Sequence, residues 1–281
     1  MSYIKGTTSL TQEVNISKAM AGAPSDIAGK YVKLAGYTRG WDGTNLAVML
    51  PQNEDPMGSG IGVFVSMLNG TTKVTGLKKN IGHANDGAYF NEQYFFATGG
   101  GEGKNSKIIK CYGMDLKHDG DYTFTGPEND ISCISHIVNN YFFLGKGNKI
   151  YVCWKDSAKM TFDKVGQEIA LPVENTVVEG WTKQGMYCRS DKLYKIYGEK
   201  VGRGSQIKRN YIAVFDLKGE CPKYTGASLS AVYSCNRTEK FLFEVQGIDV
   251  STKGEIRIAV DKRDAGVSDY KAGVYLVKLN N

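Results

Sequence analysis

Short stretches of alternating apolar and polar residues recur along this chain, each built as two strand-like runs around a polar turn. Four clear copies and one weaker one are found, at residues 82–99, 129–145, 180–198, 243–260 and, weakest, 34–50. Each pair is followed by a third run rich in β-branched and aromatic residues, such as KIYVCWKD at 149–156. Self-similarity at a regular spacing is typical of repeat architectures. The pattern therefore predicts five copies of one β unit.

A fourth short strand is predicted in four of the copies, as TKVTGL, DYTFTG, KMTFDKV and CPKYTG, whereas the fifth copy ends at Asn281 without one. An unpaired edge strand promotes aggregation, so something must cover it. The Thr-rich and β-branched stretch 3–16 is the predicted cover.

We therefore predict an all-β fold, a single five-bladed β-propeller domain whose N-terminal strand completes the C-terminal blade. The blades are expected at residues 31–80, 81–128, 129–176, 177–228 and 229–281 plus 3–16. The alternative is a two-sheet sandwich, which also uses short strands and turns. A sandwich, however, has no reason to repeat the same four-strand unit.

Composition limits the partners and the compartment. Lys and Arg number 35 and Asp and Glu 29, and the excess of +6 is spread over both halves, unlike the clustered basic stripe of a nucleic-acid-binding protein. No apolar run is long enough to span a membrane, and residues 1–30 lack the features of a secretory signal. We expect a chain made in the cytoplasm without a cleavable signal, with export by a route that needs no signal peptide as an alternative.

The six cysteines include no C-x-x-C pair, so neither zinc nor redox chemistry is indicated and free thiols are expected. Cys111 and Cys153 occupy the same place in the third strand of successive copies. We interpret them as small core residues, because a buried cysteine behaves as a small hydrophobe.

Polar residues recur at matching places in the first strand of the copies. In a propeller this strand lines the central axis, and alternate side chains point toward it. The two resulting columns are His83, Asp130, Thr182 and Glu244, and Asn85, Ser132, Gln184 and Gln246. Such convergence suits a small ligand, an ion or ordered water. The structural alternative is a wet channel that only satisfies backbone groups. No cofactor or metal is predicted beyond a channel-bound ion or water.

Four long loops are expected to surround the same end of the axis, at 51–60, 100–106, 199–209 and 261–270, with a minimal loop at 146–148. Loops on a rigid scaffold often carry binding, although solvated loops without function are an equal alternative. The 199–209 loop is basic and includes Arg203. Trp181, which opens a first strand, and Trp41 could stack against a sugar.

Four segments carry a resemblance to a known family. QGMYCRSDKLYKIYG (184–198) and EVQGIDVSTKGEIRIAVDKRD (244–264), followed by GVYLVKL near the terminus, resemble the C-terminal blades of the helveticin-J-like class III bacteriocins. GHANDGAY (82–89) resembles the strand that opens an earlier blade of that family. The resemblance implies a bacterial propeller that recognises a cell-envelope or surface component, and it assigns no catalytic residue.

The sequence thus favours a non-catalytic binding propeller for a carbohydrate-like or anionic cell-envelope ligand, such as a glycan or anionic surface polymer. The predicted ligand-binding residues are His83, Asn85, Trp181, Gln184, Glu244, Gln246 and Arg203. One alternative is a glycan hydrolase or lyase that uses Glu244 and Asp130 as acid and base with His83. A second is a structural or protein-interaction propeller in a phage tail or cytosolic assembly.

Overall fold

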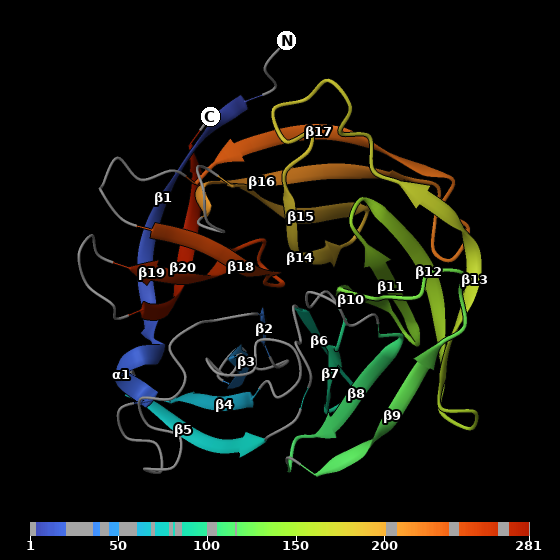
Figure 1. Cartoon of the computed structure of the whole chain (residues 1–281), viewed down its shortest axis with the longest axis horizontal. Helices are drawn as coiled ribbons and strands as arrows, with labels where there is room; N and C mark the ends of the chain where they lie inside the picture. The colour runs from blue at the N-terminus through green and yellow to red at the C-terminus, as the bar shows by residue number, and fades with distance from the viewer. Residues whose placement is uncertain are drawn as a thin grey trace.

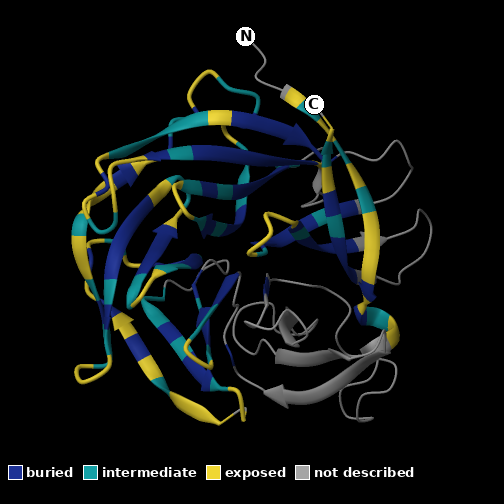
Figure 2. Ribbon diagram, turned by 180° about the vertical axis from the view of Figure 1, so that it is seen from behind, coloured by how far each residue is buried: buried dark blue, intermediate teal, exposed yellow. Residues whose placement is uncertain are grey.

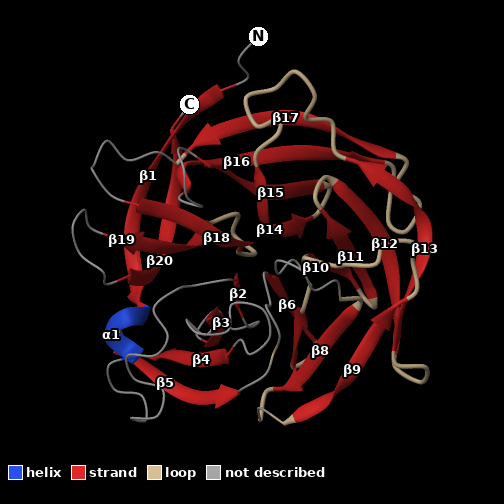
Figure 3. Ribbon diagram, viewed as in Figure 1, coloured by secondary structure: helices blue, strands red, loops and turns tan. Residues whose placement is uncertain are grey.

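The structure, a computed structural model, describes most of the chain. The described residues are 4–20, 36–39, 45–50, 61–68, 71–78, 81, 86–99, 106–115, 117–200, 207–235, 242–263 and 270–280. Within these ranges, β-strands and their turns predominate, and the one helix is the short α1 (Ile16–Met20) (Figure 3). The prediction of an all-β chain is confirmed.

The strands after α1 follow one another in four groups of four and a last group of three. The first two groups are β2 (Gly36–Arg39), β3 (Asn45–Leu50), β4 (Ile61–Leu68) and β5 (Thr71–Lys78), then β6 (Asp86–Phe90), β7 (Gln93–Ala97), β8 (Ile108–Gly113) and β9 (His118–Phe124). The next two are β10 (Cys133–Val138), β11 (Tyr141–Lys146), β12 (Lys149–Asp156) and β13 (Thr161–Ala170), then β14 (Thr182–Arg189), β15 (Lys192–Lys200), β16 (Ile207–Lys218) and β17 (Gly226–Ser234). The last group is β18 (Leu242–Val250), β19 (Ile256–Arg263) and β20 (Tyr270–Asn280). Within each group, successive strands pair antiparallel.

The N-terminal strand β1 (Ile4–Asn15) supplies the fourth strand of the last group. It pairs antiparallel with β20, in a register that runs from Thr7 opposite Asn280 to Asn15 opposite Gly273. On β19, Arg257 reaches across β20 to β1, where its Nε donates to Glu13 Oε2 at 2.7 Å. The predicted pairing of the N-terminal stretch with the last strand is confirmed.

Neighbouring groups are joined at their outer edges, which the sequence did not predict. The outermost strand β13 pairs in parallel with β9, at Thr161–Thr123 and Phe162–Phe124. A second parallel ladder joins β1 to β17. As a result, the strands form two eight-stranded sheets and one four-stranded sheet in place of five separate sheets.

The first strand of every group lies toward the middle of the molecule, and the last strand lies toward the outside (Figure 1). The first strands contact one another in a closed succession, β2 with β6, β6 with β10, β10 with β14, β14 with β18 and β18 with β2. Exposed residues gather at turns and along outer strands such as β9 and β13 (Figure 2). The middle of the molecule is therefore where residues from several groups meet.

Tight hairpins connect the first and second strands of three groups. Asn91 and Glu92 join β6 to β7 with φ of 48° and 60°, and both central residues of a two-residue I′ turn need positive φ. Asn139 and Ser190 hold positive φ at the matching turns of the next two groups. These hairpins fix the register of the first strands, since turn type and strand register are coupled.

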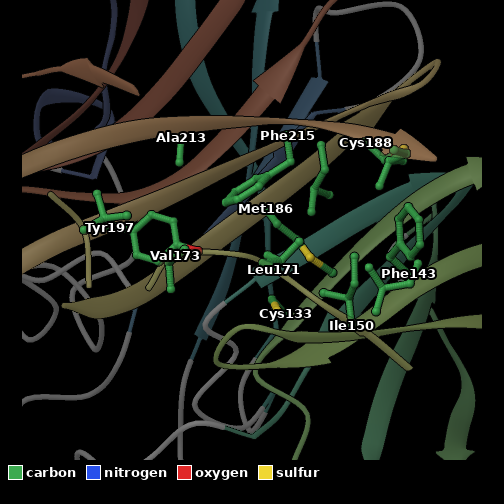
Figure 4. Close-up of a cluster of buried hydrophobic side chains, with 14 of the residues drawn as sticks. Cys133, Phe143, Ile150, Leu171, Val173, Met186, Cys188, Tyr197, Ala213 and Phe215 are labelled. Carbon is green, nitrogen blue, oxygen red and sulfur yellow. The ribbon is translucent and has the colours of Figure 1, made fainter. Parts of the chain in front are cut away.

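Apolar side chains fill the space between β10–β13 and β14–β17 (Figure 4). Phe143, Met186 and Phe215 are among the buried residues of this layer. All six cysteines are free, and Cys111 and Cys153 are fully buried, as expected for small core residues.

The fourth strand of the fourth group differs from the prediction. It was expected at CPKYTG, residues 221–226, but the structure places β17 at Gly226–Ser234. Pro222 cannot donate a ladder hydrogen bond, which makes this segment a poor central strand. The connection to β17 is closed instead by the Thr225 N–H, which donates to the Lys218 carbonyl at 2.8 Å.

Candidate functional site

In each group, the first and second strands are antiparallel. The first strand therefore begins at the same end of the sheet at which the second strand finishes. Cys133 is opposite Gly145, and Thr182 is opposite Gly198. We call this end of the molecule the strand-start face, and define it by residues 129–133, 145–149, 181–184 and 242–245. The predicted candidates Asp130, Trp181, Gln184 and Glu244 all belong to it.

Part of the predicted site lies outside the described residues. The residues that the structure does not describe include His83, Asn85, Arg203 and Trp41. They also include the predicted loop 51–60 and most of the other long loops. The basic loop is shorter than expected, since β15 continues to Lys200 and β16 begins at Ile207.

Gln184 and Glu244 come together from neighbouring first strands. The Gln184 amide Nε2 donates to Glu244 Oε1 at 3.0 Å, which joins β14 to β18. Gln184 is 9% exposed and Gln246 is 3% exposed, whereas Glu244 is half-buried. The two glutamines therefore lie beneath the surface, and Glu244 is the member of this set that an incoming ligand would meet.

The backbone on both sides of Glu244 is held by the buried side chain of Asn210 on β16. Asn210 Nδ2 donates to the Phe243 carbonyl, and Asn210 Oδ1 accepts from the Val245 N–H at 3.0 Å. Two hydrogen bonds from one buried amide fix the start of β18 against β16. Sequence reasoning missed Asn210, because it lies in a third strand and away from the two polar columns.

Asp130 is held in a separate set of contacts. Its Oδ1 accepts from the Ser106 N–H at 3.1 Å, and its Oδ2 lies 3.6 Å from Lys146 Nζ. The position of Gly99 leaves room for this carboxylate, since a Cβ there would lie 2.0 Å from Asp130 Oδ1. Both oxygens of Asp130 are thus engaged in binding neighbouring parts of the chain.

Trp181 is half-buried at the start of β14. Its ring packs against the Tyr211 ring with 4.6 Å between centroids and 57° between planes. The indole also borders the apolar layer between β10–β13 and β14–β17. Tyr211 fixes the orientation of an indole that is still partly accessible.

A buried acidic residue that sequence reasoning missed lies further along the first strands. Asp86 is fully buried at the start of β6, and its Oδ2 accepts from the Ile134 N–H at 3.1 Å and the Met186 N–H at 3.0 Å. One carboxylate oxygen thereby joins β6 to β10 and β14. Its Oδ1 has no hydrogen-bond partner in the described part of the chain.

Burial raises the pKa of Asp86 to about 8, against the opposing effects of the two backbone donors and of Lys195. Ser135 makes a similar connection, since its Oγ accepts from the Cys188 N–H at 2.7 Å. Lys195 on β15 is also fully buried. We call Asp86, Ser135 and Lys195 the central polar cluster.

The first strands approach closely beside this cluster. A Cβ on Gly185 would lie 3.0 Å from the Gln246 carbonyl oxygen and from Gly247 Cα, and 3.1 Å from Asp86 Oδ1. Glycine inside a strand often marks such a close approach of another backbone. The glycine that follows Asp86 and Gln184 in their strands was a sequence signal for this contact.

Among the residues that the structure describes, no group of three or more His, Cys, Asp or Glu side chains is arranged to hold a metal ion. In the same residues, no helix is both long and apolar enough to cross a bilayer.

Comparisons with known proteins give similarity at the level of fold. No protein-family model matches the chain, and no curated protein matches it. Among solved structures, the Mala s 1 allergen of Malassezia sympodialis matches 92% of this chain and 81% of its own, with a TM-score of 0.52 and 12% identity. The tail fiber of Staphylococcus aureus phage P68 matches 96% of this chain with a TM-score of 0.54 and 11% identity. The chain corresponds to about half of that tail-fiber chain, 52% of its length.

Proposed function

We propose that the chain is a five-bladed β-propeller. The support is the grouping of the strands in fours, the closed succession of contacts between the first strands, and the completion of the last group by β1. Closed propellers commonly protect their edges by radial repetition of four-stranded sheets. In this proposal the parallel ladders between outer strands are links between neighbouring blades.

We further propose that this propeller is a non-catalytic binding module for a carbohydrate-like or anionic cell-envelope ligand, which it meets at the strand-start face. The observation that carries the proposal is the Gln184–Glu244 pair, whose 3.0 Å hydrogen bond orients a half-buried carboxylate. Asn210 fixes the backbone beneath that carboxylate. An oriented acceptor and a partly accessible indole on the same face of the molecule are suitable for sugar hydroxyls and a sugar ring.

The catalytic alternative is less well supported by the contacts of Asp130. Glycoside hydrolysis needs two carboxyl groups that act on the same bond as acid and base or nucleophile. Asp130 instead binds Lys146 and the Ser106 N–H, and Glu244 accepts from Gln184. These contacts suit structural and binding roles better than a paired acid and base.

The assembly alternative draws its support from the likeness to the phage tail fiber, which concerns the fold alone. A protein-interaction surface of this kind would be expected to show a large exposed apolar patch. The exposed large apolar residues of the described part are Met114, Val138 and Val165, which lie in a turn, in β10 and in β13. They belong to three different elements of the described part, which favours the ligand-binding proposal.

A glycan array tests the proposal directly. We expect the wild-type chain to bind a subset of glycans, with about tenfold weaker binding by Glu244→Gln and by Trp181→Ala, because each change removes one contact of roughly 1 to 2 kcal/mol. Glu220→Gln and Trp154→Ala are matched controls, since Glu220 lies in an exposed turn and Trp154 lies on β12, toward the other end of the sheets. Absence of glycan binding by the wild type, or equal loss in the controls, would contradict the proposal.

A further inference from the structure

The register of β14 and β15 places two lysines on one side of their sheet. Lys183 is opposite Tyr197, and Met186 is opposite Lys195. Residues opposite each other in an antiparallel pair share a face, as do residues two apart along a strand. Lys183, Tyr197 and Lys195 therefore share one face of the sheet.

That face packs against β10–β13. Tyr197 and Cys133 both belong to the apolar layer between the two groups (Figure 4). The Tyr197 hydroxyl donates to Asn148 Oδ1 at 2.9 Å, in the turn between β11 and β12. Because Asn148 belongs to the strand-start face, Lys183 lies near the opening of this interface and Lys195 lies deeper.

Lys195 is a buried cation with weak direct partners. Its ammonium lies 3.5 Å from Cys133 Sγ and 3.5 Å from the Gln184 carbonyl oxygen. Within the described residues it forms no ion pair, although Asp86 is close enough for their charges to interact. A buried charge normally requires a close partner of opposite sign.

Lys183 is half-buried, and it forms no hydrogen bond or ion pair with the residues that the structure describes. Burial, and then repulsion by Lys195, lower the pKa of Lys183. Lys146, which also belongs to the strand-start face, has a partner, since Asp130 Oδ2 lies 3.6 Å from Lys146 Nζ. An approaching anion would thus find Lys146 already paired and Lys183 available.

The charge balance of this region favours an anion. With the pKa of Asp86 raised to about 8, its carboxyl is largely neutral at pH 7 and offsets little of the positive charge of Lys195. Both lysines would gain from a negative group at the opening of the interface, because the effective dielectric constant is lower there than in water.

We infer that Lys183, with Lys195 beneath it, binds an oxyanion at the strand-start face, namely a carboxylate, sulfate or phosphate group. This inference rests on the proposed function and narrows its ligand class, since the oxyanion would belong to an acidic glycan or similar anionic polymer. Glu244 and Trp181 would then contact the hydroxyls and ring of the same ligand.

Two probes test the inference, a uronic-acid oligosaccharide with its carboxyl-reduced neutral counterpart, and inorganic phosphate at constant ionic strength. We expect the wild type to bind the acidic oligosaccharide at least tenfold more tightly than the reduced one, because one charge-assisted contact is lost. Phosphate should raise the Tm of the wild type, since a ligand that binds only the folded state stabilises it.

Lys183→Gln should abolish both effects, and this half-buried side chain can be replaced without leaving a buried partner unpaired. Lys192→Gln is the matched control, because Lys192 lies at the other end of β15 and pairs with Asp216. Equal binding of the acidic and reduced oligosaccharides by the wild type would overturn the inference and leave the proposed function standing. Retention of the preference by Lys183→Gln would also overturn it. If the wild type binds neither oligosaccharide nor any other glycan, the proposed function is contradicted. The oxyanion site would then stand if phosphate raises the Tm of the wild type and not of Lys183→Gln, and it would fall if phosphate does not.

Discussion

Two buried regions of this molecule are built in opposite ways. The layer between β10–β13 and β14–β17 is apolar, and it buries Phe143 from the first of these groups and Met186 and Phe215 from the second (Figure 4). The middle, where the first strands meet, depends on a few hydrogen bonds that Asp86 and Ser135 accept from backbone N–H groups. The apolar layer gains its stability from buried area, which is not directional. The polar middle is directional, so it also specifies how neighbouring strands are aligned.

The largest effect is expected from the apolar layer. Phe143 is fully buried, with its ring 5.6 Å from the Tyr224 ring. Phe143→Ala should lower the free energy of unfolding by about 4 kcal/mol, from lost burial and the cavity left behind. Urea unfolding followed by circular dichroism measures this change, with the exposed Val165→Ala as the control. A loss below about 1 kcal/mol would show that this layer does not hold the two groups together.

The polar middle should make stability depend on pH. The pKa of Asp86 is about 8 in the folded chain, whereas an aspartate side chain free in water, as in the unfolded chain, has a pKa of 3.8. Between these values the folded state binds more protons, so stability is greatest toward acid pH and falls as pH rises toward 8. For this group we expect a loss of about 2 kcal/mol from about pH 5 to about pH 7.

Asp86→Asn isolates this contribution, because asparagine keeps the acceptor oxygen and resembles the neutral carboxylic acid. In this variant, the free energy of unfolding should fall much less between about pH 5 and about pH 7 than in the wild type. Urea unfolding at several pH values measures this difference. Asp115→Asn, at an exposed turn, is the control. An unchanged pH profile in Asp86→Asn would mean that other groups produce the decline.

The sequence predicted the repeated part of this architecture and missed the part that is made once. Alternation and turn residues predicted the strand pairs, because these signals are local. The missing fourth strand of the last copy predicted its pairing with the N-terminal stretch. The ladders between outer strands, such as Phe162 with Phe124, involve few residues and leave no periodic signal. The fourth strand of the fourth group was misplaced because Tyr224 and Thr225 look strand-like beside Pro222.

The same contrast applies to the candidate site. Gln184 and Glu244 were predicted from their columns, and the structure places them in contact. Asp86 was overlooked beside the predicted Asn85, since a one-residue offset decides which side chain faces the neighbouring strands. Lys183 and Lys195 became visible only through the strand register that puts them on one face. Convergence of residues from distant repeats cannot be read from any one repeat.

The smallest effect is expected at Ser135, where a single hydrogen bond joins β10 to β14. Ser135→Ala leaves the buried Cys188 N–H without its acceptor, which costs about 1 to 2 kcal/mol. Native-state hydrogen exchange should show faster exchange of the Cys188 amide, while the Met186 amide, which donates to Asp86, stays protected. Equal acceleration at both amides would show that the first strands open as one unit. Loss of protection at the Cys188 amide alone would show that each polar side chain in the middle holds its own pair of strands together.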